Sequence, residues 1–246
     1  MPFTPAHAAV VLPLRRLGLP LSALVAGATV PDLPMFLPGR PGYDVTHSLW
    51  AVLTLDVLLA SVAVWLWFAL VRDAYADVTP WVRDRVPARA RLTSRQWTLV
   101  PVAAALGALT HVVWDSATHE GRWIATHVPW LASEHAGIAG AQWAQWASGV
   151  LGLLVVATYT VRWIAREPVA PRASRVARPL LWFLVAPAVA VVAGAVALAG
   201  ADDLHHGAVA AAVAGVQGLV LAAAVTGACW HGAVARAREA RPAGVA

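Results

Sequence analysis

The sequence contains no lysine, so all 18 of its cationic side chains are arginine. It has a single cysteine, Cys229, and charged residues make up only 13% of its 246 residues. One cysteine excludes a disulfide framework and a thiolate metal cluster. A soluble domain carries about 25% charged residues, because water must solvate its surface. The scarcity of charge here therefore excludes an ordinary water-soluble fold.

Hydrophobic residues make up 59% of the chain and fall in long uninterrupted runs. A membrane-spanning helix needs roughly 20 largely apolar residues. Five stretches meet this requirement: His47–Val71, Gln96–Thr118, Ile138–Ile164, Pro179–Ala201 and Gly207–Val234. The sequence therefore predicts an all-α, polytopic membrane helix bundle with five spanning helices.

The N-terminal region predicts a different structure, a re-entrant helical hairpin. Thr4 and Pro5 are typical of a helix start, and two apolar runs follow, at 6–14 and 19–30. Neither run is long enough to span alone at about 1.5 Å per residue; the alternative is one kinked span. We expect residues 1–165 to form the membrane domain that carries the site. Residues 166–246 then add two scaffold helices to the same bundle.

The arginines predict how the chain is oriented. They concentrate in three segments: Arg72, Arg83, Arg85, Arg89, Arg91 and Arg95; Arg162, Arg166, Arg172, Arg175 and Arg178; and Arg236, Arg238 and Arg241. The intervening connections hold only Arg40 and Arg122. The positive-inside rule then places the three segments and the C-terminus in the cytoplasm of a multi-pass cell-membrane protein. Because loop charge of this kind sets orientation, we expect membrane lipids and no nucleic acid as partners.

Histidine and aspartate residues gather at the predicted outer face. His111, Asp115 and His119 follow one another at intervals of four residues, so a helix presents all three on one face. His47 opens the first predicted span from the same side. His7 lies in the first turn of the hairpin, and Asp32 ends it. Four segments of the sequence thus direct ionisable side chains to the same depth in the membrane.

A divalent metal explains this pattern, and zinc is the expected ion. An aspartate in a helix at membrane depth costs roughly 2.5–3.5 kcal/mol on insertion scales, so Asp115 needs a partner. Imidazole nitrogens and carboxylate oxygens are ligands that suit zinc. The predicted metal ligands are His7, Asp32, His47, His111 and Asp115.

Each of these residues also has a simpler interpretation. A lone histidine in a membrane helix is more often a hydrogen-bonded packing residue, and Asp32 between two prolines fits a helix cap. Surface exposure at the membrane interface would account for His119, His127 and His135. His205 and His206 follow two aspartates in a predicted outer loop, where a metal contact is the less favoured interpretation.

Asp56 lies within the first predicted span and is not explained by the metal site. Intramembrane carboxylates usually face the bundle interior and pair. Counting residues along the hairpin puts Arg15 and Arg16 at about the same depth in the membrane as Asp56. We therefore predict that Asp56 pairs with one of them; the alternative is a hydrogen-bonded or protonated carboxyl.

Four motifs together resemble a known family. They are Pro2-Phe3-Thr4-Pro5-Ala6-His7-Ala8, Pro31-Asp32, Thr46-His47-Ser48-Leu49, and Thr110-His111-x-x-Trp114-Asp115-Ser116-x-Thr118-His119. Over residues 1–165 they resemble a bacterial membrane family known as a domain of unknown function. The order of the motifs is also similar to that of inner-membrane metal-dependent hydrolases and, more distantly, of zinc-dependent phospholipase C.

The phospholipase resemblance implies that Asp32, His47, His111 and Asp115 hold one metal. His7 would join a second, with Asp115 as the bridge. The further His and His-x-x-x-Glu of the phospholipase pattern do not follow Asp115, so the resemblance implies neither a third metal nor the complete phospholipase mechanism.

The sequence thus favours a membrane-embedded metal-dependent hydrolase acting on an ester or phosphoester, such as a lipid, at the outer face. Asp115 and His119 are the candidate catalytic residues. The main alternative is a scaffold or interaction protein with a structural metal site, because four protein ligands would close the coordination sphere. A transporter is less favoured, because no paired broken helices occur in corresponding halves.

Overall fold

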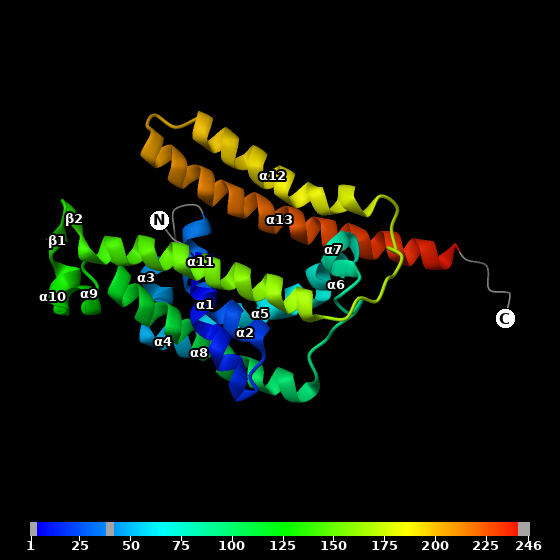
Figure 1. Cartoon of the computed structure of the whole chain (residues 1–246), viewed down its shortest axis with the longest axis horizontal. Helices are drawn as coiled ribbons and strands as arrows, with labels where there is room; N and C mark the ends of the chain where they lie inside the picture. Colours follow the sequence, from blue (N-terminus) through cyan, green and yellow to red (C-terminus); the bar gives the residue numbers. More distant parts are fainter. Residues whose placement is uncertain (1–3, 38–41, 241–246) are drawn as a thin grey trace. The chain divides into compact units, whose positions relative to one another are not determined.

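The computed structural model describes residues 4–37 and 42–240, apart from the side chain of His205. Nearly all of this chain is helical (Figure 1). Within the described part, strands occur only as a short antiparallel pair, β1 (Glu134–His135) and β2 (Ile138–Ala139). The predicted all-α class is confirmed. Pro2, Phe3, Arg40 and Arg241, used in the motif and charge arguments, lie outside the described residues.

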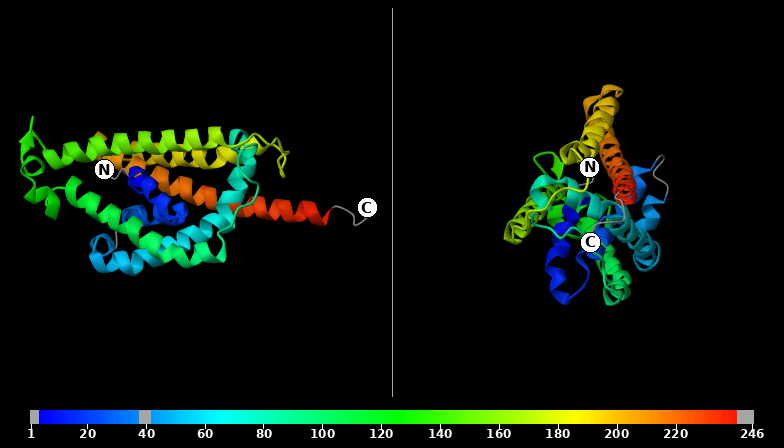
Figure 2. Two further views of the ribbon diagram at one scale, coloured as in Figure 1. Left: turned by 60° about the horizontal axis from the view of Figure 1, so that its bottom comes forward. Right: turned by 90° about the vertical axis from the view of Figure 1, so that its right-hand side faces the viewer.

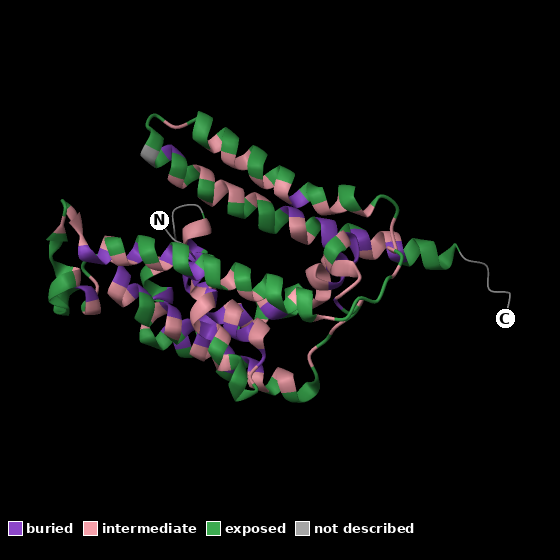
Figure 3. Cartoon of the chain, in the orientation of Figure 1, coloured by how far each residue is buried: buried purple, intermediate pink, exposed green. Residues whose placement is uncertain are grey.

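Five helical segments are long and apolar enough to span a membrane, as predicted. The first is α5 (Leu55–Leu66), which continues through the π-helical turn η4 (Trp67–Val71) into α6 (Arg72–Val78). The second is α8 (Ser94–Thr118), which continues toward α9 (Trp123–His127). The other three are single helices: α11 (Gly140–Arg166), α12 (Pro179–Ala199) and α13 (Leu204–Glu239). Helix α12 is exposed or half-buried along nearly all its length (Figure 3). Its surface is mostly leucine, valine and alanine, which lipid solvates and water does not.

The first span begins later than the sequence predicted. The chain forms α3 (Tyr43–Thr46) and α4 (Leu49–Leu53) before α5 starts at Leu55. The Ser48 hydroxyl accepts a hydrogen bond from the Ala51 amide and so starts a new helix, while Thr54 leaves the helical conformation with φ −130° and ψ −85°. The prediction of one helix from His47 was therefore wrong, because local capping competes with continuous helix at polar residues.

The N-terminal hairpin is present. Its first arm comprises η1 (Thr4–His7), α1 (Ala8–Val11) and η2 (Leu12–Leu17), and its second comprises α2 (Leu21–Gly27) and η3 (Val30–Phe36). Gly18 joins them with φ +75°, a left-handed conformation that glycine adopts without steric cost. The two short arms explain why neither apolar run forms a span.

Two glycines set the distance between α2 and α8. A Cβ at Gly27 would lie 2.1 Å from the Ala104 carbonyl oxygen, and one at Gly107 would lie 2.3 Å from that of Leu24. The helix backbones therefore touch directly, as small residues permit between membrane helices. This contact fixes the hairpin against the helix that carries His111 and Asp115.

The helices group into two compact units. The first contains residues 1–64 and 92–162, and the second contains 65–91 and 163–246. In the second, α12 and α13 run side by side (Figure 2), and Trp230 is buried with Ala74 and Val78 of α6. Segment 65–91, which includes the short α7 (Pro80–Arg83), thus groups with the helices beyond residue 162. That all five spans form one bundle stays a prediction.

The predicted partner of Asp56 was wrong. Asp56 is fully buried, and neither carboxylate oxygen has a hydrogen-bond partner among the described residues. Arg15 instead donates to the Tyr159 hydroxyl at 2.9 Å, with its guanidinium 5.1 Å from the ring centroid. Arg16 is exposed. The membrane depth predicted for Asp56 was wrong because the residue count assumed an unbroken helix from His47.

Candidate metal centre

Four predicted ligands converge in the first unit. Asp32 comes from η3, His47 from the junction of α3 and α4, and His111 and Asp115 from α8. One ligand atom from each lies within 4.8 Å of the others. All four residues are buried, from 0% exposed at His111 to 7% at His47. Water has little access to these imidazoles and carboxylates. Groups within the site must therefore balance their charge, because unpaired buried charge is very unfavourable.

The spacing of these atoms matches a tetrahedral metal site. His111 Nε2 lies 3.3 Å from Asp115 Oδ2 and 3.6 Å from Asp32 Oδ1. His47 Nε2 lies 3.4 Å and 3.8 Å from the same two atoms. Charge-assisted hydrogen bonds are shorter, at about 2.7–2.9 Å. Ligands placed tetrahedrally about 2.0–2.1 Å from one ion lie roughly 3.4 Å from each other, which is close to the observed separations.

The backbone fixes which nitrogen of each ring faces the site. His111 Nδ1 lies 2.9 Å from the Ala28 carbonyl oxygen, and His47 Nδ1 lies 2.9 Å from that of Tyr43. A carbonyl oxygen can only accept, so each Nδ1 carries the proton and donates. Each neutral ring then presents the lone pair of Nε2. Ligating histidines are usually oriented by such an outer hydrogen bond.

The unpaired atoms complete the test of fit. His47 Nε2, His111 Nε2 and Asp115 Oδ1 are buried without a hydrogen-bond partner among the described residues. Two nitrogen lone pairs thus face two carboxylate oxygens, and a divalent cation between them would satisfy all four acceptors. The donor set and its spacing both fit a divalent ion, and the cluster can hold one.

Asp32 is oriented by a residue that the sequence analysis did not assign to the site. The Thr4 hydroxyl donates to Asp32 Oδ2 at 2.5 Å, which directs Oδ1 toward the histidines. Burial raises the pKa of Asp32, but the hydrogen bond that Thr4 donates stabilises the carboxylate, and the pKa stays below its usual value. Asp32 is therefore ionised at neutral pH, as a ligand must be.

His7 and His119 flank the opposite side of Asp115. His7 Nε2 lies 3.3 Å and His119 Nδ1 lies 3.5 Å from Asp115 Oδ1. The ring of His7 stacks on that of His111 at 4.0 Å between centroids. Burial lowers the pKa of His7 to about 4, so the ring is neutral and able to coordinate at pH 7. His7 is adjacent to the group of four but is not one of its members.

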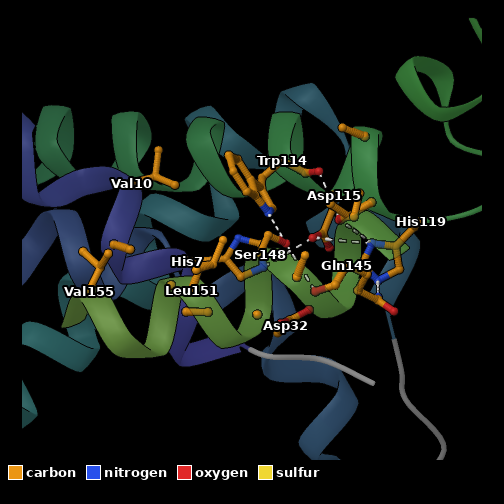
Figure 4. Close-up of a pocket in the computed structure, with 18 residues that line it drawn as sticks. His7, Val10, Asp32, Trp114, Asp115, His119, Gln145, Ser148, Leu151 and Val155 are labelled. Carbon is orange, nitrogen blue, oxygen red and sulfur yellow. Dashed lines mark hydrogen bonds and ion pairs between the residues drawn. The ribbon is translucent and has the colours of Figure 1, made fainter. Parts of the chain in front are cut away.

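A cavity of about 570 Å³ opens onto this side of the centre (Figure 4). Asp32, Asp115, His7 and His119 line its polar end. Its remaining walls come mainly from α1, α8 and α11, where they are apolar or small, as at Val10, Trp114, Leu151, Gly152 and Val155. The cavity therefore places the buried carboxylates at one end of a mostly apolar lining.

A family model described as a domain of unknown function, DUF4184, matches residues 1–234. The chain belongs to the DUF4184 family. No curated protein and no solved structure matches the chain. The similarity to metal-dependent hydrolases and to phospholipase C therefore rests on the motifs alone.

The DUF4184 match extends well past residue 165, where the sequence resemblance ended. It takes in α12 and most of α13, which carry none of the four clustered ligands. The family model therefore covers these two helices as well as the segments that carry the four ligands.

The other histidines of this DUF4184 protein do not join the group of four. His127 and His135 contact backbone carbonyls of Trp123 and Trp130 close in sequence and are exposed or half-exposed. His206 contacts Asp203, the N-cap of α13; the side chain of His205 is outside the described residues. Local hydrogen bonds account for these three rings, whereas His231 Nε2 is buried without a hydrogen-bond partner among the described residues.

Sequence reasoning missed two side chains at the site. Thr4 was interpreted as a helix cap, although its hydroxyl binds Asp32. Gln145 was not considered, yet its Nε2 lies 2.8 Å from His119 Nε2. The signal that could have identified Gln145 was its polar amide within the otherwise apolar segment 138–164.

Proposed function

We propose that this protein is a membrane-embedded hydrolase that uses a divalent metal, zinc by the chemistry of its ligands, to cleave an ester or phosphoester of a lipid. The observation that carries the proposal is the cavity that opens onto Asp115 and Asp32. Structural zinc sites are closed, whereas catalytic sites keep a position for water or substrate. Here the carboxylates border an open cavity of about 570 Å³.

The apolar lining of the cavity supports a lipid as the substrate class. Its apolar walls match an acyl chain in chemistry, and its polar end brings the head of such a molecule to Asp115. Ligand sites generally combine an apolar wall with a few convergent polar groups. A water-soluble phosphoester would gain nothing from Val10, Leu151 and Val155.

The chain's own residues have distinct parts in this reaction. Asp32, His47, His111 and Asp115 would hold the ion, which when bound activates water and polarises the scissile group. His7 lies where the phospholipase resemblance implies a ligand of a second ion bridged by Asp115. His119 lines the cavity, with Nδ1 toward Asp115 and Nε2 at Gln145, and in this proposal it would move a proton at the substrate.

The experiment compares turnover with metal content in detergent-purified protein. Metal-loaded protein should hydrolyse members of a panel of lipid esters and phosphoesters, and Asp115→Asn should abolish turnover. We expect His119→Gln to lower it by about 10²–10⁴-fold, the usual contribution of a general acid or base. His127→Gln, at an exposed histidine outside the site, should leave it unchanged.

The scaffold alternative gives the opposite result. A structural ion would be retained by protein that hydrolyses nothing in the panel, and its removal by a chelator would unfold the hairpin. A catalytic ion, by contrast, should be removable with loss of turnover and little loss of helix, and its return should restore activity.

We propose that the metal centre faces the outer side of the cell membrane, because the arginine-rich segments are expected in the cytoplasm. Single cysteines introduced by Trp130→Cys and Arg166→Cys in a Cys229→Ser background test this. A membrane-impermeant maleimide added to intact cells should label position 130 and not position 166. Labelling at 166 alone would reverse the orientation.

A further inference from the structure

A second pocket lies in the second unit, within the arginine-rich part of the chain. Its volume is about 440 Å³. Arg89, Arg91, Arg175 and Arg238 line it together with Asp73 and Trp230. Arg89 and Arg91 come from the loop between α7 and α8, Arg175 comes from the 167–178 linker, and Arg238 comes from the last turn of α13. Three separate segments thus direct guanidinium groups to one place.

The protein neutralises only part of the positive charge of this pocket. The carboxylate of Asp73 is already engaged, because Arg72 lies 3.0 Å from Oδ1 and Arg91 lies 2.8 Å from Oδ2. Among the described residues, Arg89, Arg175 and Arg238 have no carboxylate oxygen within 4.0 Å. Three arginines therefore remain available to an external anion.

The wall of the pocket is held in place before any ligand arrives. Asp77, which is buried, accepts hydrogen bonds from the Arg175 amide at 3.0 Å and from Trp230 Nε1 at 2.9 Å. The Arg175 guanidinium lies over the Trp230 ring, 5.7 Å from its centroid. Beside it, buried Nε2 of His231 has no hydrogen-bond partner among the described residues. Preorganised donors lose less freedom on binding.

We propose that this pocket binds a phosphate group, carried by an anionic phospholipid headgroup or by a soluble phosphate. Guanidinium groups match phosphate oxygens in bidentate geometry and are preferred for this role. The arginine asymmetry predicts that this side is cytoplasmic, where anionic lipids supply such groups and basic pockets between membrane helices bind them. Trp230 and Val234 form the apolar part of the pocket lining.

Binding is tested on the full chain in a neutral detergent by following its thermal unfolding. Phosphatidylglycerol, phosphatidylcholine and inorganic phosphate are titrated separately at constant ionic strength. We expect phosphatidylglycerol to raise the unfolding temperature and phosphatidylcholine to have little effect. Arg89→Gln and Arg238→Gln change exposed side chains, so both should fold, and each should weaken binding about tenfold, as expected for one charge-assisted hydrogen bond.

Arg166→Gln is the matched control, because Arg166 is an exposed arginine outside the pocket. It should bind as the wild type does. Stabilisation by inorganic phosphate as well would identify a soluble phosphate site, and stabilisation by phosphatidylglycerol alone would identify a headgroup site. Equal effects of both lipids without any effect of phosphate, or binding unchanged in both pocket variants, would overturn the proposal.

Discussion

We expect the wild-type protein to retain a divalent ion on purification and protein carrying His111→Ala to lose it. The substitution removes one of four ligands whose positions are already set. Changing residues that merely orient ligands costs about 10–100-fold in metal affinity, so the loss of a ligand should cost at least about 100-fold. Elemental analysis of detergent-purified protein, with a zinc-competition titration, measures both quantities.

The same substitution should also lower stability. Without the His111 ring, buried Asp32 and Asp115 lose the group that lies between them and the Ala28 carbonyl oxygen. Removing one partner of a buried ionic group typically costs about 3–5 kcal/mol. Thermal unfolding should therefore begin at a lower temperature than in the wild type, in the absence as well as in the presence of added zinc.

His127→Ala serves as the control for both measurements. Its ring also contacts a carbonyl oxygen of its own helix, but it is exposed and outside the group of four. It should keep the wild-type metal content. If wild-type protein holds no divalent ion even after zinc is supplied, the four residues are a buried ion-pair network, and the hydrolase proposal fails with the metal site.

Gly107→Ala is expected to destabilise the protein although it adds a single methyl group. Its Cβ would lie 2.3 Å from the Leu24 carbonyl oxygen and 2.8 Å from the Ala28 amide nitrogen. Both are backbone atoms that no rotamer change can move, so α2 must shift away from α8. Overpacking of this kind costs about 3 kcal/mol or more, which lowers the unfolding temperature by roughly 10 °C.

The shift should also reach the metal centre. Ala28 follows α2 directly, and its carbonyl oxygen orients His111. Moving α2 therefore disturbs a hydrogen bond that fixes the ligand, and metal affinity should fall by about 10–100-fold. Gly232→Ala is the control, since its Cβ meets only the end of the Arg236 side chain at 3.5 Å. Equal stability of the two variants would show that α2 and α8 are not in direct contact.

The two errors made from the sequence have one origin. Hydropathy cannot distinguish a continuous span from short helices joined at Ser48 and Thr54, because every segment involved is apolar. The first predicted span therefore started too early, and the depth assigned to Asp56 was wrong with it. Pairing Asp56 with Arg15 then ignored Tyr159, which is far away in sequence and close in space.

The sequence by itself determined the all-helical class, the five spans, the hairpin and the residue types suited to a metal site. Each follows from composition, run length and local spacing, which act between neighbours along the chain. Only the tertiary structure decided that His47 and Asp32 meet the His111–Asp115 pair at metal-ligand spacing, and that Thr4 and the Ala28 carbonyl oxygen orient them. Those contacts depend on how closely α2 approaches α8, and that distance is set by Gly27 and Gly107 through packing that no local pattern records.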